Sequence, residues 1–118
     1  MLIYKIMISL NFQQFDEETM CALYSIDFDS GTSLQSMLND IQELEQNGKC
    51  HSVGTVQIYK AKELYDEPIV EVKYIGGIIS DTELKKIPIH ILNKPVKYAY
   101  MFSTIIKNGN YHIAITVK

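Results

Sequence analysis

The chain has 118 residues, of which 47% are hydrophobic and 21% charged, and its formal net charge is −3 at pH 7. A chain of this length fits one domain, and this composition excludes an intrinsically disordered protein. The apolar runs are too short to cross a bilayer, and the apolar amino terminus lacks the small-residue cleavage site of a signal peptide. We therefore expect a single domain over residues 1–118, located in the cytoplasm and without membrane association.

The charges are segregated along the chain. Between Ile6 and Gly48 there are eight carboxylates and no cation, and between Leu84 and Lys118 there are six lysines and no carboxylate. Two opposed fields of this kind either cancel inside the fold or face two different partners. All eleven cations are lysines, and the lack of arginine disfavours sequence-specific DNA recognition and phosphoryl transfer.

The first half of the chain predicts two strands and one helix. Apolar residues alternate over 2–12 and again over 20–28, which indicates two half-buried strands that pair antiparallel. Apolar residues at steps of three and four then predict a helix over 33–46, with Thr32 and Gln35 as a capping box. Two glutamates in the last turn of this helix break a local rule, because the helix dipole disfavours anions there.

The second half predicts mainly strands. Two alternating runs are followed by one helical turn, capped by Ser80 or Asp81, and by a further alternating run. We expect the first two runs and the last run to be strands, the last an edge strand because it contains Pro88. Gly76-Gly77 is expected to end or bulge the second strand. The expected elements, in order, are strands at 52–60 and 69–75, the helical turn at 80–86 and the edge strand at 87–92.

The carboxyl terminus predicts a β-hairpin. Asn108-Gly109 favours a two-residue type I′ turn, which sets a register that pairs Phe102 with Ile115 and Tyr100 with Val117. In this register the apolar faces of both strands coincide, and the tyrosines of the hairpin lie on that apolar face.

These elements together indicate an α+β fold. We expect a single, strongly twisted antiparallel sheet of about six or seven strands, packed on the one main helix at 33–46. One helix cannot cover so many strands. The sheet is therefore expected either to curl around the helix or to bury part of its apolar face against a second copy, as a homodimer, or against another partner.

The acidic stretch gives the leading hypothesis for function. Its carboxylates are placed by the predicted elements on a turn, a strand end and the outer face of the helix, where they would form a negative surface for a basic protein. We expect a small, non-catalytic protein that recognises, sequesters or inhibits a partner protein. The residues of this surface are Asp16, Glu17, Glu18, Asp27, Asp29, Asp40 and Glu43.

The basic end gives the alternative hypothesis. Cations and aromatic rings occur together there, the mixture that holds a nucleotide or single-stranded nucleic acid by charge and stacking. This alternative predicts binding or sequestration of a small anionic, nucleotide-like molecule. Its candidate residues are His90, Lys94, Lys97, Tyr98, Tyr100, Lys107, Tyr111 and His112.

A third hypothesis is a small hydrolase or a metal-dependent enzyme. It requires Asp27 and Asp29, or Cys50 and a histidine, to converge in a cleft. Neither the histidines nor Cys21 and Cys50 match a zinc spacing, and we expect both cysteines to be reduced. The sequence therefore predicts no catalytic residue, no metal site and no cofactor.

Overall fold

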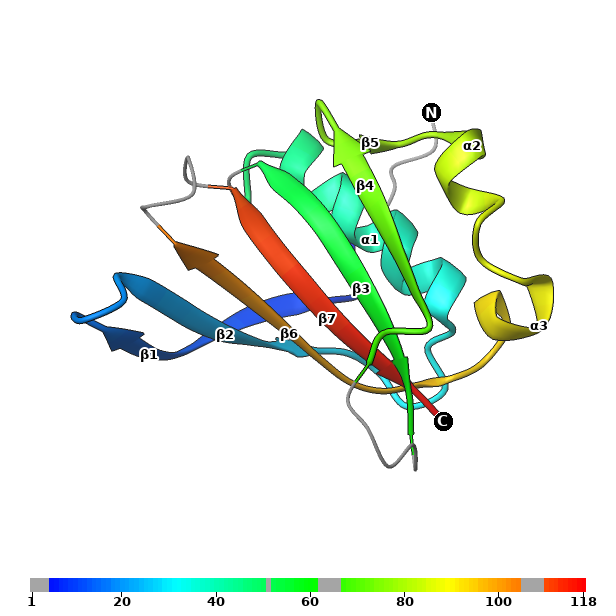
Figure 1. The fold of residues 1–118 in the computed structure, drawn as a ribbon, viewed down its shortest axis with the longest axis horizontal. Coiled ribbons are helices and arrows are strands. Elements are labelled where there is room, and N and C mark those ends of the chain that lie inside the picture. The colour runs from blue at the N-terminus through cyan, green and yellow to red at the C-terminus, as the bar shows by residue number, and fades with distance from the viewer. Residues whose placement is uncertain (1–4, 51, 62–66, 105–109) are drawn as a thin grey trace.

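The computed structural model describes residues 5–50, 52–61, 67–104 and 110–118, which form one seven-stranded sheet and three helices (Figure 1). The sheet order is β1-β2-β6-β7-β3-β4-β5. The strands are β1 (Ser9–Asp16), β2 (Cys21–Asp27), β3 (Val53–Lys60), β4 (Val70–Ile75), β5 (Ile78–Ile79), β6 (Val96–Thr104) and β7 (Tyr111–Val117), and the helices are α1 (Leu34–Gln46), α2 (Asp81–Leu84) and α3 (Ile89–Leu92).

The α+β class is confirmed, but the sheet is mixed and not purely antiparallel. β7 lies between β6 and β3, and it runs parallel to β3, with Val56 opposite Ile113 and Ile58 opposite Ile115. The other neighbouring strands pair antiparallel. Local patterning could not show this, because a parallel partner is joined through a long connection and leaves no turn signal in the sequence.

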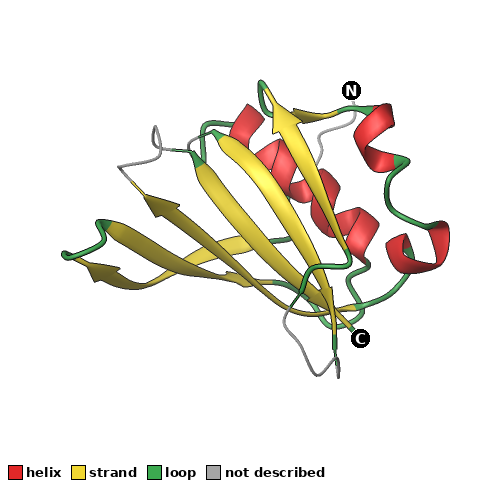
Figure 2. Ribbon diagram, in the orientation of Figure 1, coloured by secondary structure: helices red, strands yellow, loops and turns green. Residues whose placement is uncertain are grey.

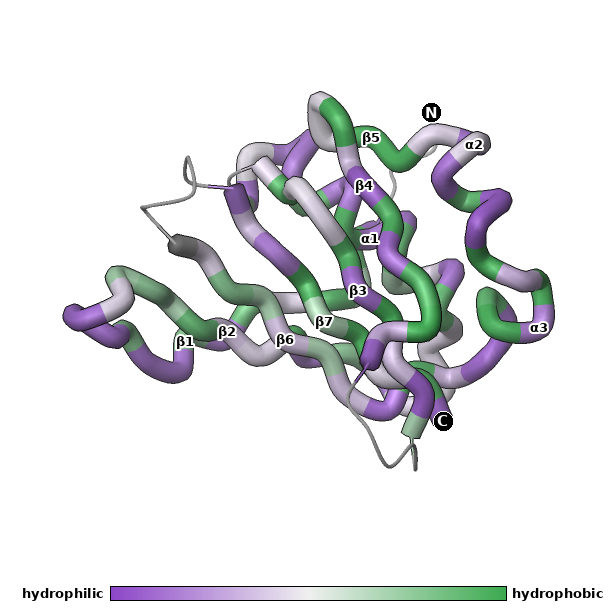
Figure 3. The backbone as a smooth tube through the Cα atoms, in the orientation of Figure 1, coloured by the Kyte–Doolittle hydropathy of each residue, from purple (hydrophilic) through white to green (hydrophobic). Residues whose placement is uncertain are grey.

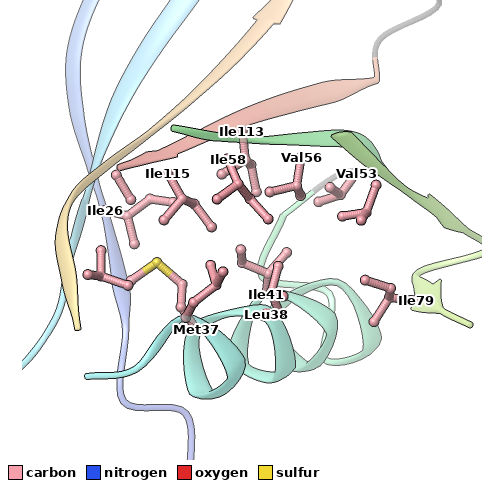
Figure 4. Packing of buried hydrophobic residues seen from close by; sticks show 14 of the residues in the cluster. Ile26, Met37, Leu38, Ile41, Val53, Val56, Ile58, Ile79, Ile113 and Ile115 are labelled. Atoms are coloured by element: carbon pink, nitrogen blue, oxygen red, sulfur yellow. The ribbon is translucent and has the colours of Figure 1, made fainter. Parts of the chain in front are cut away.

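The core lies between α1 and one face of the sheet (Figure 4). The apolar stripe of α1 is buried against the inward side chains of β3 and β7, and the β1–β2 pair lies beside the helix. The predicted helix is thus confirmed. Its fully buried residues, with the strand residues they face, include Leu34, Met37, Leu38, Ile41, Val56, Ile58, Ile113 and Ile115.

The other face of the sheet carries no helix within the described residues (Figure 2). We call it the open face. It presents Tyr98 and Tyr100 of β6, His112 and Ala114 of β7, and Gln57 of β3, which lie between the buried positions of these strands. No helix in the described part of the chain is long and apolar enough to cross a membrane.

The first strand begins later than predicted. Residues 1–4 lie outside the described residues, residues 5–8 are not in a strand, and β1 runs from Ser9 to Asp16. Its second half consists of residues that the alternation assigned to a polar link. Backbone pairing with β2, with a bulge between Phe12 and Gln14, extends the strand although its side chains are exposed.

The edge strand predicted at 87–92 is wrong, because this segment forms the short helix α3. Ile87 and Ile91 are 3% and 5% exposed, whereas Ile89 between them is 76% exposed. Ile89 and Ile91 would share one face of a strand, but two residues apart on a helix they point in nearly opposite directions. Pro88 precedes the helix with φ of −58°, which is the angle that proline fixes at a helix start.

The register predicted for the carboxyl-terminal hairpin is also wrong. Ser103 faces Tyr111 and Phe102 faces His112, a shift of three residues from the predicted pairing, and the Asn108-Gly109 turn lies outside the described residues. A shift of the register by an odd number of residues moves the side chains predicted on one face of the strand to the other face. A two-residue turn with positive φ at both positions occurs instead at Gly76 and Gly77, between β4 and β5.

The exchanged face of β6 has a physical cause. Ala99 and Met101 are buried over the helix, while Tyr98 and Tyr100 point to the open face. β6 pairs with β2 as well as with β7, so its register satisfies both neighbours at once. A small and a flexible side chain fill the crowded interior above α1, where two tyrosines would need space and partners for their hydroxyl groups.

Candidate anion-binding site

A pocket of about 410 Å³ lies at the end of the sheet where β3 and β7 finish and β6 begins. Four of the five residues that line it are lysines, and the fifth is Ala61. We call it the lysine pocket. Its lysines are Lys60, Lys94, Lys97 and Lys118. Figure 3 shows hydrophilic segments close to the C-terminus, at this end of the sheet.

Strand direction brings the lysines together. β3 and β7 are parallel, so Lys60 at the end of β3 pairs with Val117 at the end of β7. β6 is antiparallel to β7, so its first residue, Val96, also pairs with Val117. Backbone hydrogen bonds fix the adjoining segments, from Ala61 N to Val117 O at 2.8 Å and from Lys118 N to Pro95 O at 3.0 Å. Lysines distant in sequence therefore meet at one end of the sheet.

The electrostatics of this pocket favour an anion. No Asp or Glu side chain is among the described residues that line it, and none of its lysine side chains forms an ion pair within the described chain. Away from the pocket, Glu83 forms an ion pair with Lys86 in the α2 region, and this contact lowers the pKa of the half-buried Glu83 carboxyl. Four lysines that line one concavity bring like charges close together, and an anion bound among them would offset their repulsion.

Aromatic side chains extend from the pocket along β6. Tyr98, Tyr100 and Phe102 occupy alternate positions of this strand on the open face, and we call them the aromatic row. Tyr98 and Tyr100 are 45% and 41% exposed, with ring centroids 5.9 Å apart. The Nζ atom of Lys97 lies 5.9 Å from the centroid of the Tyr98 ring, so the pocket and the row adjoin.

His112 supports the far end of the row. Its ring lies against Phe102 with centroids 5.8 Å apart, and its Nδ1 lies 2.6 Å from Oγ1 of Thr55. The Nε2 atom is buried and has no hydrogen-bond partner among the residues that the structure describes.

The structure brings together only part of the predicted basic site. Lys94 and Lys97 line the lysine pocket, and Tyr98, Tyr100 and His112 share the open face. Tyr111 lies on the opposite face, where it is buried against the ring of Tyr24, and burial raises the pKa of its hydroxyl to about 12. His90 is exposed on α3, and Lys107 lies outside the described residues.

Sequence reasoning missed Lys60 and Lys118 as pocket residues. Both lie at strand ends, and only the parallel pairing of β3 with β7 places them beside Lys94 and Lys97. The alternation of β3 and β7 could have suggested two central strands, but it carries no information about their mutual direction.

The predicted acidic residues do not form one surface. Asp16, Glu17 and Glu18 are exposed around the turn between β1 and β2, and we call them the acidic turn. There Oδ1 of Asp16 accepts a hydrogen bond from Glu18 N at 2.9 Å. Asp27 and Asp29 are exposed elsewhere, at and beyond the end of β2, and Glu43 is half-buried on α1.

Asp40 was expected on the solvent-exposed outer face of the helix. This expectation is wrong, because Asp40 is only 2% exposed. It lines a second pocket, of about 270 Å³, together with Asp29 and residues at the start of α1. Within the described residues, no ion pair joins the acidic turn to a lysine. The acidic turn and the lysine pocket therefore do not neutralise each other by direct contact.

Among the described residues, Cys50 and His112 do not come together as a catalytic pair. Cys50 packs against the core on the helix side of the sheet, whereas His112 lies on the open face, and His51 lies outside the described residues. Burial and the nearby Glu45 raise the pKa of the Cys50 thiol to about 11, which keeps it protonated at neutral pH. No three His, Cys, Asp or Glu side chains of the described chain are grouped to hold a metal ion.

Comparisons with protein-family models, with curated proteins and with solved structures found no match to this chain. A function for this chain is therefore inferred from the residues and geometry of the site itself.

Proposed function

We propose that this protein binds a small anionic, nucleotide-like ligand without transforming it. Phosphate groups would occupy the lysine pocket, and an aromatic base would stack on Tyr98 at its border. The observation that carries this proposal is the lining of the pocket by four lysines from three strand ends and a loop, with an exposed tyrosine next to Lys97. Lysine holds phosphate as a point charge, so the absence of arginine is compatible with this role.

Thermal unfolding in the presence of pyrophosphate, ATP or adenosine tests the proposal. A ligand present at one hundred times its dissociation constant stabilises the folded state by about 2.7 kcal/mol, which raises the melting temperature by several degrees. We expect a rise with ATP, a smaller rise with pyrophosphate and none with adenosine, because the charge supplies most of the attraction.

Matched variants locate the effect. Lys94→Gln/Lys97→Gln removes two charges from the pocket, and Lys5→Gln/Lys85→Gln removes two exposed charges elsewhere. Only the first pair should abolish the rise in melting temperature. Equal loss in both pairs would mean that the anion senses only net charge, and no rise with any anion would refute the proposal.

A second candidate function concerns the acidic turn. Phe12, Phe15 and Met20, which flank it, are 57%, 45% and 36% exposed, and carboxylates beside exposed apolar side chains suit a basic protein surface. We propose that this end of the β1–β2 hairpin docks such a partner and occludes it. The aromatic side chains would be the anchors, and the charges would raise the rate of association.

Titration with an amphipathic lysine–leucine peptide tests this second candidate. Binding should weaken as salt rises, and Asp16→Asn/Glu17→Gln/Glu18→Gln should weaken it at low salt. Asp27→Asn, which also removes an exposed carboxylate, serves as the control. Binding that does not change with ionic strength would exclude recognition through the acidic turn.

A further inference from the structure

We infer that the ligand of the lysine pocket is a short single strand of nucleic acid, whose bases stack along the aromatic row. This inference rests on the proposed anion site and names the class of its ligand. It follows from the length of the row, from the space around its rings and from the charges at its two ends.

The row is longer than a mononucleotide needs. Alternate residues of a strand are about 6.8 Å apart, so the three residues of the row span roughly 14 Å. One base covers one ring. Tyr98 and Tyr100 leave more than two fifths of their surfaces in solvent, although they lie in the middle of a seven-stranded sheet. Successive bases stacking on successive rings would use this exposed surface.

The neighbours of the row leave the rings accessible. On β7, Thr116 lies opposite Tyr98 and Ala114 opposite Tyr100, and on β2 Ser25 lies opposite Tyr100. These side chains are short, so the tyrosine rings stand above them. Phe102 is less accessible, because it lies between Leu23 of β2 and His112 of β7. We therefore assign two bases to the tyrosines and a third, more weakly held base to Phe102.

The charges limit the length of the bound strand. The row begins at the lysine pocket, and at its far end Thr104 pairs with Cys21, which itself pairs with Asp16 of the acidic turn. Phosphates are attracted at the first end and repelled at the second. The site therefore accommodates about three nucleotides on the row, with the strand held most firmly at the lysine end.

The polar side chains further across the open face, on β7, β3 and β4, are already engaged with each other. Gln57 Nε2 donates to Glu71, Tyr59 Oη donates to Gln57 Oε1, and Thr55 pairs with His112. They have little capacity left for the edges of bases. Recognition by stacking and charge without base-edge hydrogen bonds tolerates any sequence, so we expect a weak preference among bases.

Fluorescence anisotropy with end-labelled oligothymidylates of one to eight nucleotides tests the inference. Affinity should rise from one to three nucleotides and rise little further, and oligouridylates should behave alike. A hexamer of abasic deoxyribose phosphate, with the same charge but no bases, should bind at least tenfold more weakly, because each stacked base contributes about 1–3 kcal/mol.

Variants separate stacking from charge. Tyr98→Ala and Tyr100→Ala should each weaken the hexamer about tenfold and leave pyrophosphate binding unchanged, whereas Phe12→Ala, an exposed ring on the other side of the sheet, should change neither. Lys94→Gln/Lys97→Gln should reduce the slope of log affinity against log salt by up to about 1.4, since each phosphate contact contributes about 0.7. Thermal melts check that each variant folds.

The outcomes distinguish this inference from the proposed function. If pyrophosphate binds at the lysine pocket but the abasic and the normal hexamer bind equally, the ligand is not a stacked strand and the inference fails alone. If affinity does not increase beyond one nucleotide, the ligand is a mononucleotide and the inference again fails. If no anion binds, both fail.

Discussion

Tyr74 shows how one hydroxyl group ties the sheet to the helix. It lies in β4, is 5% exposed, and donates a hydrogen bond of 2.7 Å to the carbonyl of Leu38 in α1. Burial raises the pKa of this hydroxyl far above its ordinary value, so it remains a donor at any physiological pH. The alternating run at 69–75 predicted the strand that carries Tyr74, but local periodicity carries no information about the helix carbonyl that its hydroxyl meets.

Tyr74→Phe should lower the free energy of unfolding by about 1 kcal/mol, the usual contribution of one hydrogen bond. Urea denaturation followed by circular dichroism measures this loss. Tyr98→Phe is the matched control, because its ring is exposed on the open face, and the midpoint should not change. Equal midpoints for both variants and the unmodified protein would show that the Tyr74 bond adds nothing to stability.

At the scale of elements, α1 illustrates what local signals can and cannot determine. The spacing of its apolar residues predicted the helix correctly, but the capping residue is Ser33, whose side chain accepts from Ser36 N at 3.2 Å. The predicted box used Thr32, whose hydroxyl instead donates to Asp29 O at 2.7 Å. Glu45 lies in the last turn, where the helix dipole disfavours an anion. Its carboxylate accepts a hydrogen bond from Val53 N, and this bond holds the start of β3 against the end of α1.

Ser33→Ala should therefore cost about 1 kcal/mol of stability, as the loss of an N-cap does in other helices. Gln35→Ala, which would break the box predicted from sequence, should cost little, because Gln35 is exposed and alanine suits a helix. The midpoints of urea denaturation of the two variants distinguish the Ser33 cap from the predicted box of Thr32 and Gln35. A larger loss for Gln35→Ala would contradict the cap in the structure.

The error in the faces of β6 and the missed lysine pocket share one cause. The helix and the strands β2, β3 and β4 follow local periodicity, and their bounds were predicted to within a residue or two. The faces of β6 follow from pairing with β2 and β7, which are distant in sequence. The same distance hid the lysine pocket. Half of its lysines were proposed from composition, but their convergence depends on the direction of β7 beside β3.

For the whole molecule, the separation of charge seen in the sequence persists in part. The lysine pocket and the acidic turn lie near opposite ends of β6, while Asp40 is buried and leaves the acidic set. Three buried or half-buried groups that are neutral at pH 7, Cys50, Tyr74 and Tyr111, also have raised pKa values. Together, these raised pKa values make the free energy of unfolding of the whole protein depend on pH.

Stability should fall as pH rises above about 9. Unfolding returns the Cys50 thiol from a pKa of about 11 to 9.0, and returns the two tyrosines to 10.0. The folded protein therefore holds more protons than the unfolded chain in alkaline solution, so the stabilisation is complete below pH 9 and is lost at higher pH. Urea midpoints between pH 8 and 11 measure this. Cys50→Ser should move the onset upward, and a midpoint that rises with pH would contradict the assignment.

The central place of β7 has a consequence for biosynthesis. This strand, residues 111–117, joins the half of the sheet that contains β1, β2 and β6 to the half that contains β3, β4 and β5. Until a ribosome has translated it, β3 lacks one neighbour and β6 lacks one, and their apolar surfaces stay open to chaperones and to other nascent polypeptides. The two halves of the sheet can therefore join only after the ribosome has translated residues 111–117.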